Sequence, residues 1–322
     1  MLHLRAVCPA ELTDAVLGLL RERPGATHVV LLPGAAVSPP GDVVEADLAR
    51  EAADGILTGL RELGVDRSGG ITLESVDTAL SSAADTAQEL APGDGADAVV
   101  WEELVARTGE ESRLNATFQA FLTIACLLAA VGAVTDSPVT VVGAMVVGPE
   151  FGPLAAVAVG LVRRRWDLVR GAALALGVGF PAAMVVTGIA TALGEVAGLF
   201  DRASIANLDQ VDFIYDVGPF SLIVAMLAGA AGMLSLTSTK SAALVGVFIS
   251  VTTVPAAGFV AVAAVLGDWE RALFSAVQLV VNLAGIVLAA VLVLWLRNRR
   301  GAVGDTPPPI RTPGSDRHTD SA

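Results

Sequence analysis

The chain is organised around the stretch Val141-Val-Gly-Ala-Met-Val-Val-Gly-Pro-Glu-Phe-Gly-Pro-Leu154, which lies inside a long apolar run. The stretch contains Pro149 and Pro153, and each proline removes a backbone donor and clashes with the preceding helical turn. We therefore expect a helix to be interrupted here, near the middle of a membrane. Such a break is tolerated only where neighbouring protein or a water-filled cavity satisfies the freed backbone groups.

Glu150 is an ionisable residue at this predicted break. Placing a charge at that depth costs about 3 kcal/mol or more, so an ionisable residue there is a candidate functional group. A second interpretation is a proline kink in which Glu150 faces an aqueous vestibule or bonds a backbone group.

Composition indicates a multi-pass α-helical membrane protein. Of 322 residues, 54% are hydrophobic and only 16% are charged, and the apolar residues concentrate from Thr117 to Leu296. The net charge of −13 argues against nucleic acid as a partner, because phosphate binding needs a basic face. Cys8 and Cys126 have no metal-ligand spacing, and no HExxH, P-loop or Ser/His/Asp pattern occurs. We expect no enzymatic centre, cofactor or metal.

The membrane domain, 115–296, contains six apolar stretches, each near the ~20 residues needed to cross a bilayer. We expect the second and fifth to be broken helices. The six predicted spans are 115–135, 138–162, 168–194, 217–236, 242–266 and 272–296.

A small α+β domain is predicted before the membrane part, at residues 1–76. Its apolar pattern gives the order β-α-β-β-α-β, which is typical of a ferredoxin-like fold. That fold serves many functions, so the domain either binds a regulatory ligand or only assembles the protein. The predicted strands are 2–7, 27–32, 42–46 and 70–76, and the predicted helices are 10–23 and 48–63.

The remaining segments are a connection and a tail. In the connection, 77–114, residues 81–97 have a linker-like composition, and 99–113 form an amphipathic pattern. We expect this helix to lie on the membrane surface or against the bundle. Residues 297–322 have the composition of a disordered cytoplasmic tail.

Basic residues predict the orientation. The flanks on the side of the N-terminus hold ten arginines and lysines, and the opposite flanks hold only Arg202 and Arg271. This positive-inside bias places both termini in the cytoplasm. The ten are Arg107, Arg113, Arg163, Arg164, Arg165, Arg170, Lys240, Arg297, Arg299 and Arg300.

A shift of 103 positions aligns the two halves of the membrane domain. It places Trp166 on Trp269, and it sets Pro149–Pro153 opposite Thr252–Ala256, where the fifth span is interrupted. Three crossings in each half insert in opposite senses, so we expect a 3+3 inverted repeat with a site at the interface of the halves. Helix N-termini there suit an anion and freed carbonyls suit a cation. Burial of Glu150 would let it exchange a proton.

The candidate substrate- or ion-binding residues lie at the two predicted breaks and on the sixth span. Thr252 and Thr253 can instead bond freed backbone groups, and Gln278 and Asn282 can instead hydrogen-bond between helices. The candidates are Gly148, Pro149, Glu150, Gly152, Pro153, Thr252, Thr253, Pro255, Gln278 and Asn282.

The membrane part resembles the bacterial family known as domain of unknown function 389, over about residues 98–296. The resemblance implies a multi-pass inner-membrane protein, often preceded by a small cytoplasmic domain, and supplies no established substrate. The chain departs from the family pattern at Gly148, Glu150 and Ala256. The resemblance is carried by Gly143-Ala144-Met145, Pro149, Gly152-Pro153, the segment 228–232 and Val254-Pro255.

Three functions are compatible with the sequence. The first is a transporter that moves a small solute or ion by alternating access, with Glu150 as the coupling group. The second is an oligomeric channel gated by the cytoplasmic domain. The third is a membrane receptor or assembly protein through which nothing passes. Small residues at helical spacing, such as Gly171, Ala175 and Gly179, favour close helix packing or contacts within a homo-oligomer.

Overall fold

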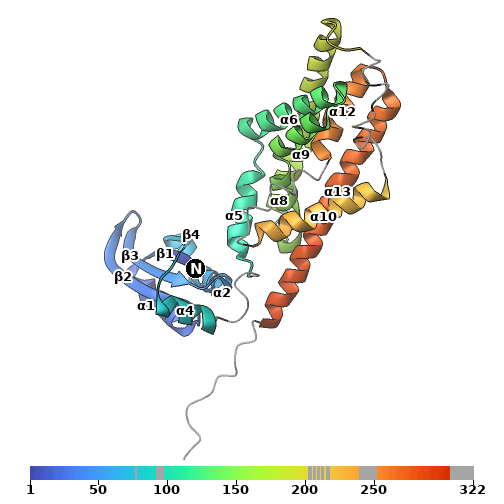
Figure 1. Cartoon of the computed structure of the whole chain (residues 1–322). Helices are drawn as coiled ribbons and strands as arrows, with labels where there is room; N and C mark the ends of the chain where they lie inside the picture. The colour runs from blue at the N-terminus through green and yellow to red at the C-terminus, as the bar shows by residue number, and fades with distance from the viewer. Residues whose placement is uncertain are drawn as a thin grey trace, which may run out of the picture.

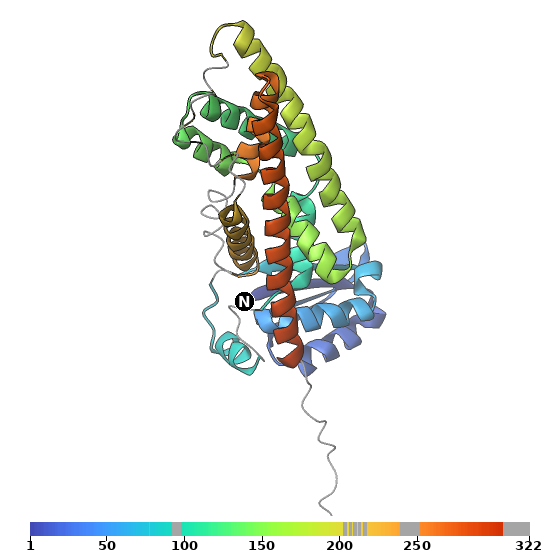
Figure 2. The same ribbon diagram turned by 90° about the vertical axis from the view of Figure 1, so that its right-hand side faces the viewer.

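A small α/β domain lies at one end of a bundle of apolar helices in the computed structural model of the chain (Figure 1). The structure describes residues 1–76, 78–91, 98–201, 205, 208, 211, 214, 218–238 and 252–304. Figures 1 and 2 both show the two longest helices, α9 (Trp166–Val196) and α13 (Trp269–Gly304), running along the length of the bundle.

The N-terminal domain has the predicted order of strands and helices, with one added helical turn. Its strands form an antiparallel sheet in the order β2-β3-β1-β4. Burial alternates along β1, and its inward side chains pack with those of α1 and α2 in one core. The elements are β1 Leu2–Cys8, α1 Ala10–Glu22, β2 Ala26–Val37, β3 Pro40–Leu48, α2 Arg50–Glu62, α3 Val65–Ser68 and β4 Gly70–Ser75.

Two local predictions for this part need correction. The β2–β3 hairpin is longer than predicted, because pairing continues to Val37 and Pro40 beyond the expected strand ends. The segment predicted as linker contains a helix, α4 (Ser82–Leu90). It forms because the Ser81 hydroxyl accepts backbone N–H groups at the helix start and the following residues are rich in alanine.

Among the described residues, four helices of the membrane part are long and apolar enough to cross a bilayer, and the bent pair α7–α8 makes up to five. The structure thus supports a helical membrane protein whose outer face contacts lipid. Large apolar side chains such as Leu174, Val185 and Leu227 are exposed on that face. The remaining bounds are α5 Trp101–Glu111, α6 Ala116–Val134, α7 Pro138–Val147, α8 Phe151–Arg163, α10 Pro219–Leu236 and α12 Thr253–Val265.

Five of the six predicted spans correspond to described helices, and the fifth span is described only in part. The first, third, fourth and sixth correspond to α6, α9, α10 and α13, and the second is broken as predicted, with a bend of 50° between α7 and α8. Of the fifth span only α12 is described, because residues 239–251 lie outside the described residues, so six spans are not established. The predicted tail was wrong in its first part, since α13 continues to Gly304.

Close backbone contacts between helices depend on glycine at two positions. A Cβ added at Gly229 of α10 would lie 2.4 Å from the carbonyl oxygen of Ile286 in α13. A Cβ added at Gly258 of α12 would lie 2.7 Å from the carbonyl oxygen of Cys126 in α6. Because the obstacles are backbone atoms, a larger residue would have to move a whole helix.

We predict that Gly229→Ala destabilises the protein by about 1–3 kcal/mol, since overpacking forces α10 away from α13. The measurement is thermal unfolding of the full chain in detergent. The matched control is Gly177→Ala in α9, where nothing lies within 4 Å of an added Cβ. Equal melting temperatures for the two variants would show that the α10–α13 contact is looser than described.

Candidate functional site

The break between α7 and α8 occupies Gly148, Pro149 and Glu150. Gly148 has an extended backbone (φ −63°, ψ 129°), which is the conformation favoured before a proline. Pro153, also expected to break the helix, instead lies in the first turn of α8, where its missing N–H costs no intrahelical bond. Pro255 takes the same place in the first turn of α12.

The Glu150 side chain is buried at the start of α8, with 8% of its surface exposed. Its Oε1 accepts a hydrogen bond of 2.5 Å from the hydroxyl of Thr253, the first residue of α12 and itself fully buried. Its Oε2 is buried and has no hydrogen-bond partner among the described residues. The N-termini of α8 and α12, the positive ends of the two helix dipoles, therefore lie near one carboxylate.

A second polar group lies on the adjoining face of α13. Asn282 Nδ2 and Gln278 Nε2 both donate to the hydroxyl oxygen of Thr252, at 2.9 Å and 3.4 Å. Asn282 and Gln278 are each 2% exposed. Because Thr252 and Thr253 are consecutive, the two groups form one polar region around the start of α12, which we call the break cluster: Glu150, Thr252, Thr253, Gln278 and Asn282.

The remaining predicted site residues are glycines and prolines, which affect the backbone conformation and the space around the cluster. Gly148 leaves room for the carboxylate, since an added Cβ would lie 2.3 Å from Glu150 Oε2. Gly152 instead faces Glu111 of α5, whose Cβ would be 2.7 Å from an added Cβ. Pro153 and Pro255 are buried in the helix starts, and the structure gives them no polar contact with the cluster.

Ser275 was missed by the sequence analysis. It is fully buried on α13, one turn before Gln278, and its hydroxyl has no hydrogen-bond partner among the described residues. The spacing of Ser275, Gln278 and Asn282 places all three on one face of a helix, and that pattern could have identified Ser275.

Helix α5 joins the N-terminal domain to the broken helix. At its start, Glu103 accepts a bond of 3.0 Å from Arg50 of α2, and Glu102 pairs with Arg61. Trp101 and Leu104 pack on α8 in a shared core, so the amphipathic helix lies against the bundle. Figure 1 shows α5 leading from the domain to the bundle.

Polar residues in the N-terminal domain also meet in ways that the sequence did not indicate. His3 and His28 each bond one oxygen of Asp47 at 2.8 Å, and the other ring nitrogen of His28 lies 2.9 Å from Ser81 Oγ. Burial alone would raise the pKa of Asp47, but the two histidine bonds outweigh it and lower that pKa. Because Ser81 caps α4 and Asp47 lies on β3, this series of hydrogen bonds connects the start of α4 to the sheet.

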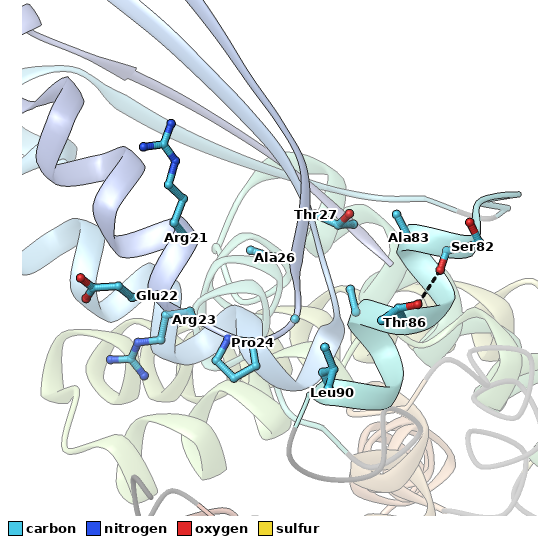
Figure 3. Close-up of a pocket in the computed structure, with 12 residues that line it drawn as sticks. Arg21, Glu22, Arg23, Pro24, Ala26, Thr27, Ser82, Ala83, Thr86 and Leu90 are labelled. Atoms are coloured by element: carbon cyan, nitrogen blue, oxygen red, sulfur yellow. Dashed lines mark hydrogen bonds between the residues drawn. The ribbon is translucent and has the colours of Figure 1, made fainter. Parts of the chain in front are cut away.

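A shallow pocket lies beside α4, between it and the turn from α1 to β2 (Figure 3). Figure 3 shows Arg21, Glu22 and Arg23 on the side away from α4. Every polar side chain on the lining is at least partly exposed, so the pocket has no desolvated group to fix a ligand. The break cluster is therefore the stronger candidate site.

Residues 145–288 match the model of the family described as Domain of unknown function (DUF389), which confirms the predicted resemblance. The matched segment begins in the last turn of α7, includes the break, and ends in α13. It is shorter than the 98–296 expected. No curated protein and no solved structure matches the chain.

We predict that Thr253→Val destabilises the protein by about 1–3 kcal/mol, because the buried Glu150 oxygen loses its donor. A double-mutant cycle with Glu150→Gln, measured by thermal unfolding in detergent, should give a coupling energy clearly different from zero. Thr253→Ser is the matched control, since it keeps the hydroxyl. Strictly additive effects would mean that the Thr253–Glu150 bond is not formed in solution.

Proposed function

We propose that this member of the domain of unknown function 389 family is a membrane transporter. It moves a small solute or ion by alternating access, and Glu150 couples the movement to protonation. The supporting observation is the bond from Thr253 to Glu150, which joins the starts of two interrupted or short helices from opposite halves of the chain. A buried carboxylate inside apolar helices is costly, and such residues commonly mark transport pathways.

The spacing of the helices supports a repeat. α6 and α10 begin 103 residues apart, as do α9 and α13. Helices α8 and α12 have the same length of 13 residues and carry a proline at the same place. We propose that the halves are inverted copies, because a unit with three crossings must insert in the opposite sense from its repeat.

The proposed orientation places both termini in the cytoplasm. Arg163, at the end of α8, stacks 5.0 Å from the ring of Trp101, which is tied to the N-terminal domain. In Figure 2 the C-terminal end of α13, where Arg297 and Arg299 lie, is at the same end of the molecule as that domain. The basic residues and the α/β domain therefore share one side, as the positive-inside rule requires of a cytoplasmic face.

We predict that Glu150→Gln lowers pH-dependent proton flux by about tenfold or more, since the amide cannot exchange a proton. The measurement is proton uptake into proteoliposomes that contain a pH-sensitive dye, driven by an imposed pH gradient. Gly177→Ala, on the lipid-facing side of α9, is the control and should behave like the wild type. Equal pH-dependent flux in Glu150→Gln and wild type would remove Glu150 from the mechanism.

A gated channel is the second candidate, and the position of α5 favours it. The helix connects Arg50 and Arg61 of the α/β domain to Gly152 beside the break, so a shift of the domain reaches the site through one rigid element. Unitary current steps in planar bilayers would identify a channel, whereas stoichiometric coupled flux would identify a carrier.

For either function, we predict that Arg50→Ala alters flux or open probability by about 2- to 10-fold while single-channel conductance or substrate affinity stays unchanged. Glu103→Ala should act in the same direction, and the double variant should add little. The control is Arg67→Ala, because Arg67 is exposed and has no ion pair among the described residues. No change in Arg50→Ala would mean that the domain does not act through α5.

A further inference from the structure

In the break cluster, side-chain donors form hydrogen bonds within the cluster, whereas some acceptor oxygens have no partner among the described residues. The Thr253 hydroxyl donates to Glu150, and the amide groups of Gln278 and Asn282 both donate to Thr252. Thr253, Gln278 and Asn282 thus each direct one donor at another member of the cluster. Two oxygen atoms of the cluster have no hydrogen-bond partner among the described residues: Glu150 Oε2 and Gln278 Oε1. An amide oxygen, and a carboxylate oxygen when Glu150 is ionised, carry no hydrogen, so each can accept a hydrogen bond or coordinate a cation but cannot donate.

Among the described residues, the site contains an acidic group without a positively charged ion-pair partner. Glu150 is the one buried acidic or basic residue in the described part of α6 to α13, and the buried thiol of Cys126 on α6 is close enough to interact electrostatically with it. No arginine or lysine among the described residues forms an ion pair with it. A carboxylate in such surroundings must be neutralised by a bound proton or cation, because an isolated buried charge is very costly.

An anion is disfavoured at the same place. The N-termini of α8 and α12 suit a negative group, but the Glu150 carboxylate already lies there and receives the Thr253 hydroxyl. A second negative charge beside it would be repelled strongly in a low-dielectric site. The space next to Oε2 is also small, since an added Cβ on Gly148 would lie 2.3 Å from Oε2 and 2.8 Å from Val254.

We propose that the break cluster binds a small monovalent cation, a proton or an alkali ion such as Na⁺, at Glu150 Oε2. We infer that the further oxygen ligands are Gln278 Oε1 and the Ser275 hydroxyl, the two buried side-chain oxygens of α13 without a hydrogen-bond partner among the described residues. The proposal rests on the transporter function for its biological meaning, and it names the coupling or transported species as positively charged. Binding itself can be measured without transport.

The experiment uses the full chain in detergent, in sodium, potassium and choline salts of chloride and gluconate at equal ionic strength. The first readout is the infrared carbonyl band of a protonated carboxylic acid, taken as the difference between wild type and Glu150→Gln over a pH series. The second is the melting temperature. We expect the intensity of this band to change with pH. If Na⁺ shifts the pH at which the band changes, the bound species is an alkali ion. If Na⁺ has no effect on that pH, the bound species is a proton.

Variants test the individual ligands. The apparent cation affinity should fall about tenfold or more in Glu150→Gln and severalfold in Gln278→Leu and Ser275→Ala, and Glu150→Asp should retain binding because it keeps the carboxylate. Gln119→Leu is the matched control for Gln278→Leu, since Gln119 donates to the Gly179 carbonyl on α9 and to Thr123, and has no hydrogen bond to the cluster among the described residues. If Glu150→Asp binds and Glu150→Gln does not, loss of folding is not the cause.

The proposal is overturned if the Glu150 band neither titrates nor responds to any cation. It is also overturned if chloride stabilises the wild type in the choline salts more than gluconate does and Glu150→Gln strengthens that effect. If cation binding is present but proteoliposomes show no flux, the cation site stands and the transporter proposal fails.

Discussion

A polar backbone and an ionisable side chain inside apolar helices have to find partners within the protein, because lipid offers none. The structure meets part of this requirement at the 148–150 break by bringing the start of α12 against the start of α8, so that one of the two Glu150 carboxylate oxygens receives a donor. The Thr253 hydroxyl donates to Glu150, and the neighbouring Thr252 accepts from Gln278 and Asn282. One short segment of α12 thus connects the break in the first half with the polar face of α13.

The close approach of the helices serves this arrangement. Glycines at 229 and 258 let α10 meet α13 and α12 meet α6 at backbone distance. On the other side, α5 packs along α8 from Trp101 to Glu111 and is anchored in the α/β domain by Arg50 and Arg61. The break cluster therefore lies in a bundle whose helix α8 also packs against a helix that is bonded to the α/β domain.

Sequence reasoning predicted the break in the second span, with Glu150 at it, and the order of elements in the N-terminal domain, because prolines and apolar periodicity are local signals. It did not predict α4, since Ser81 acts as a cap only through backbone geometry, nor the extension of α13 to Gly304. It also missed Ser275 and the meeting of His3, His28 and Asp47, because these contacts join residues from separate elements and the chain carries no sign of their proximity.

The sequence by itself determined that the chain is an apolar, helical membrane protein with a small α/β domain in front and an interruption at Pro149. Those properties follow from composition, from hydrophobic period and from the missing N–H of proline. Only the tertiary structure decided which residue donates a hydrogen bond to Glu150 and which side-chain oxygens of the break cluster remain without a partner among the described residues. That choice depends on how α8, α12 and α13 pack, and packing is set by side-chain volume and helix direction across more than 100 residues of chain.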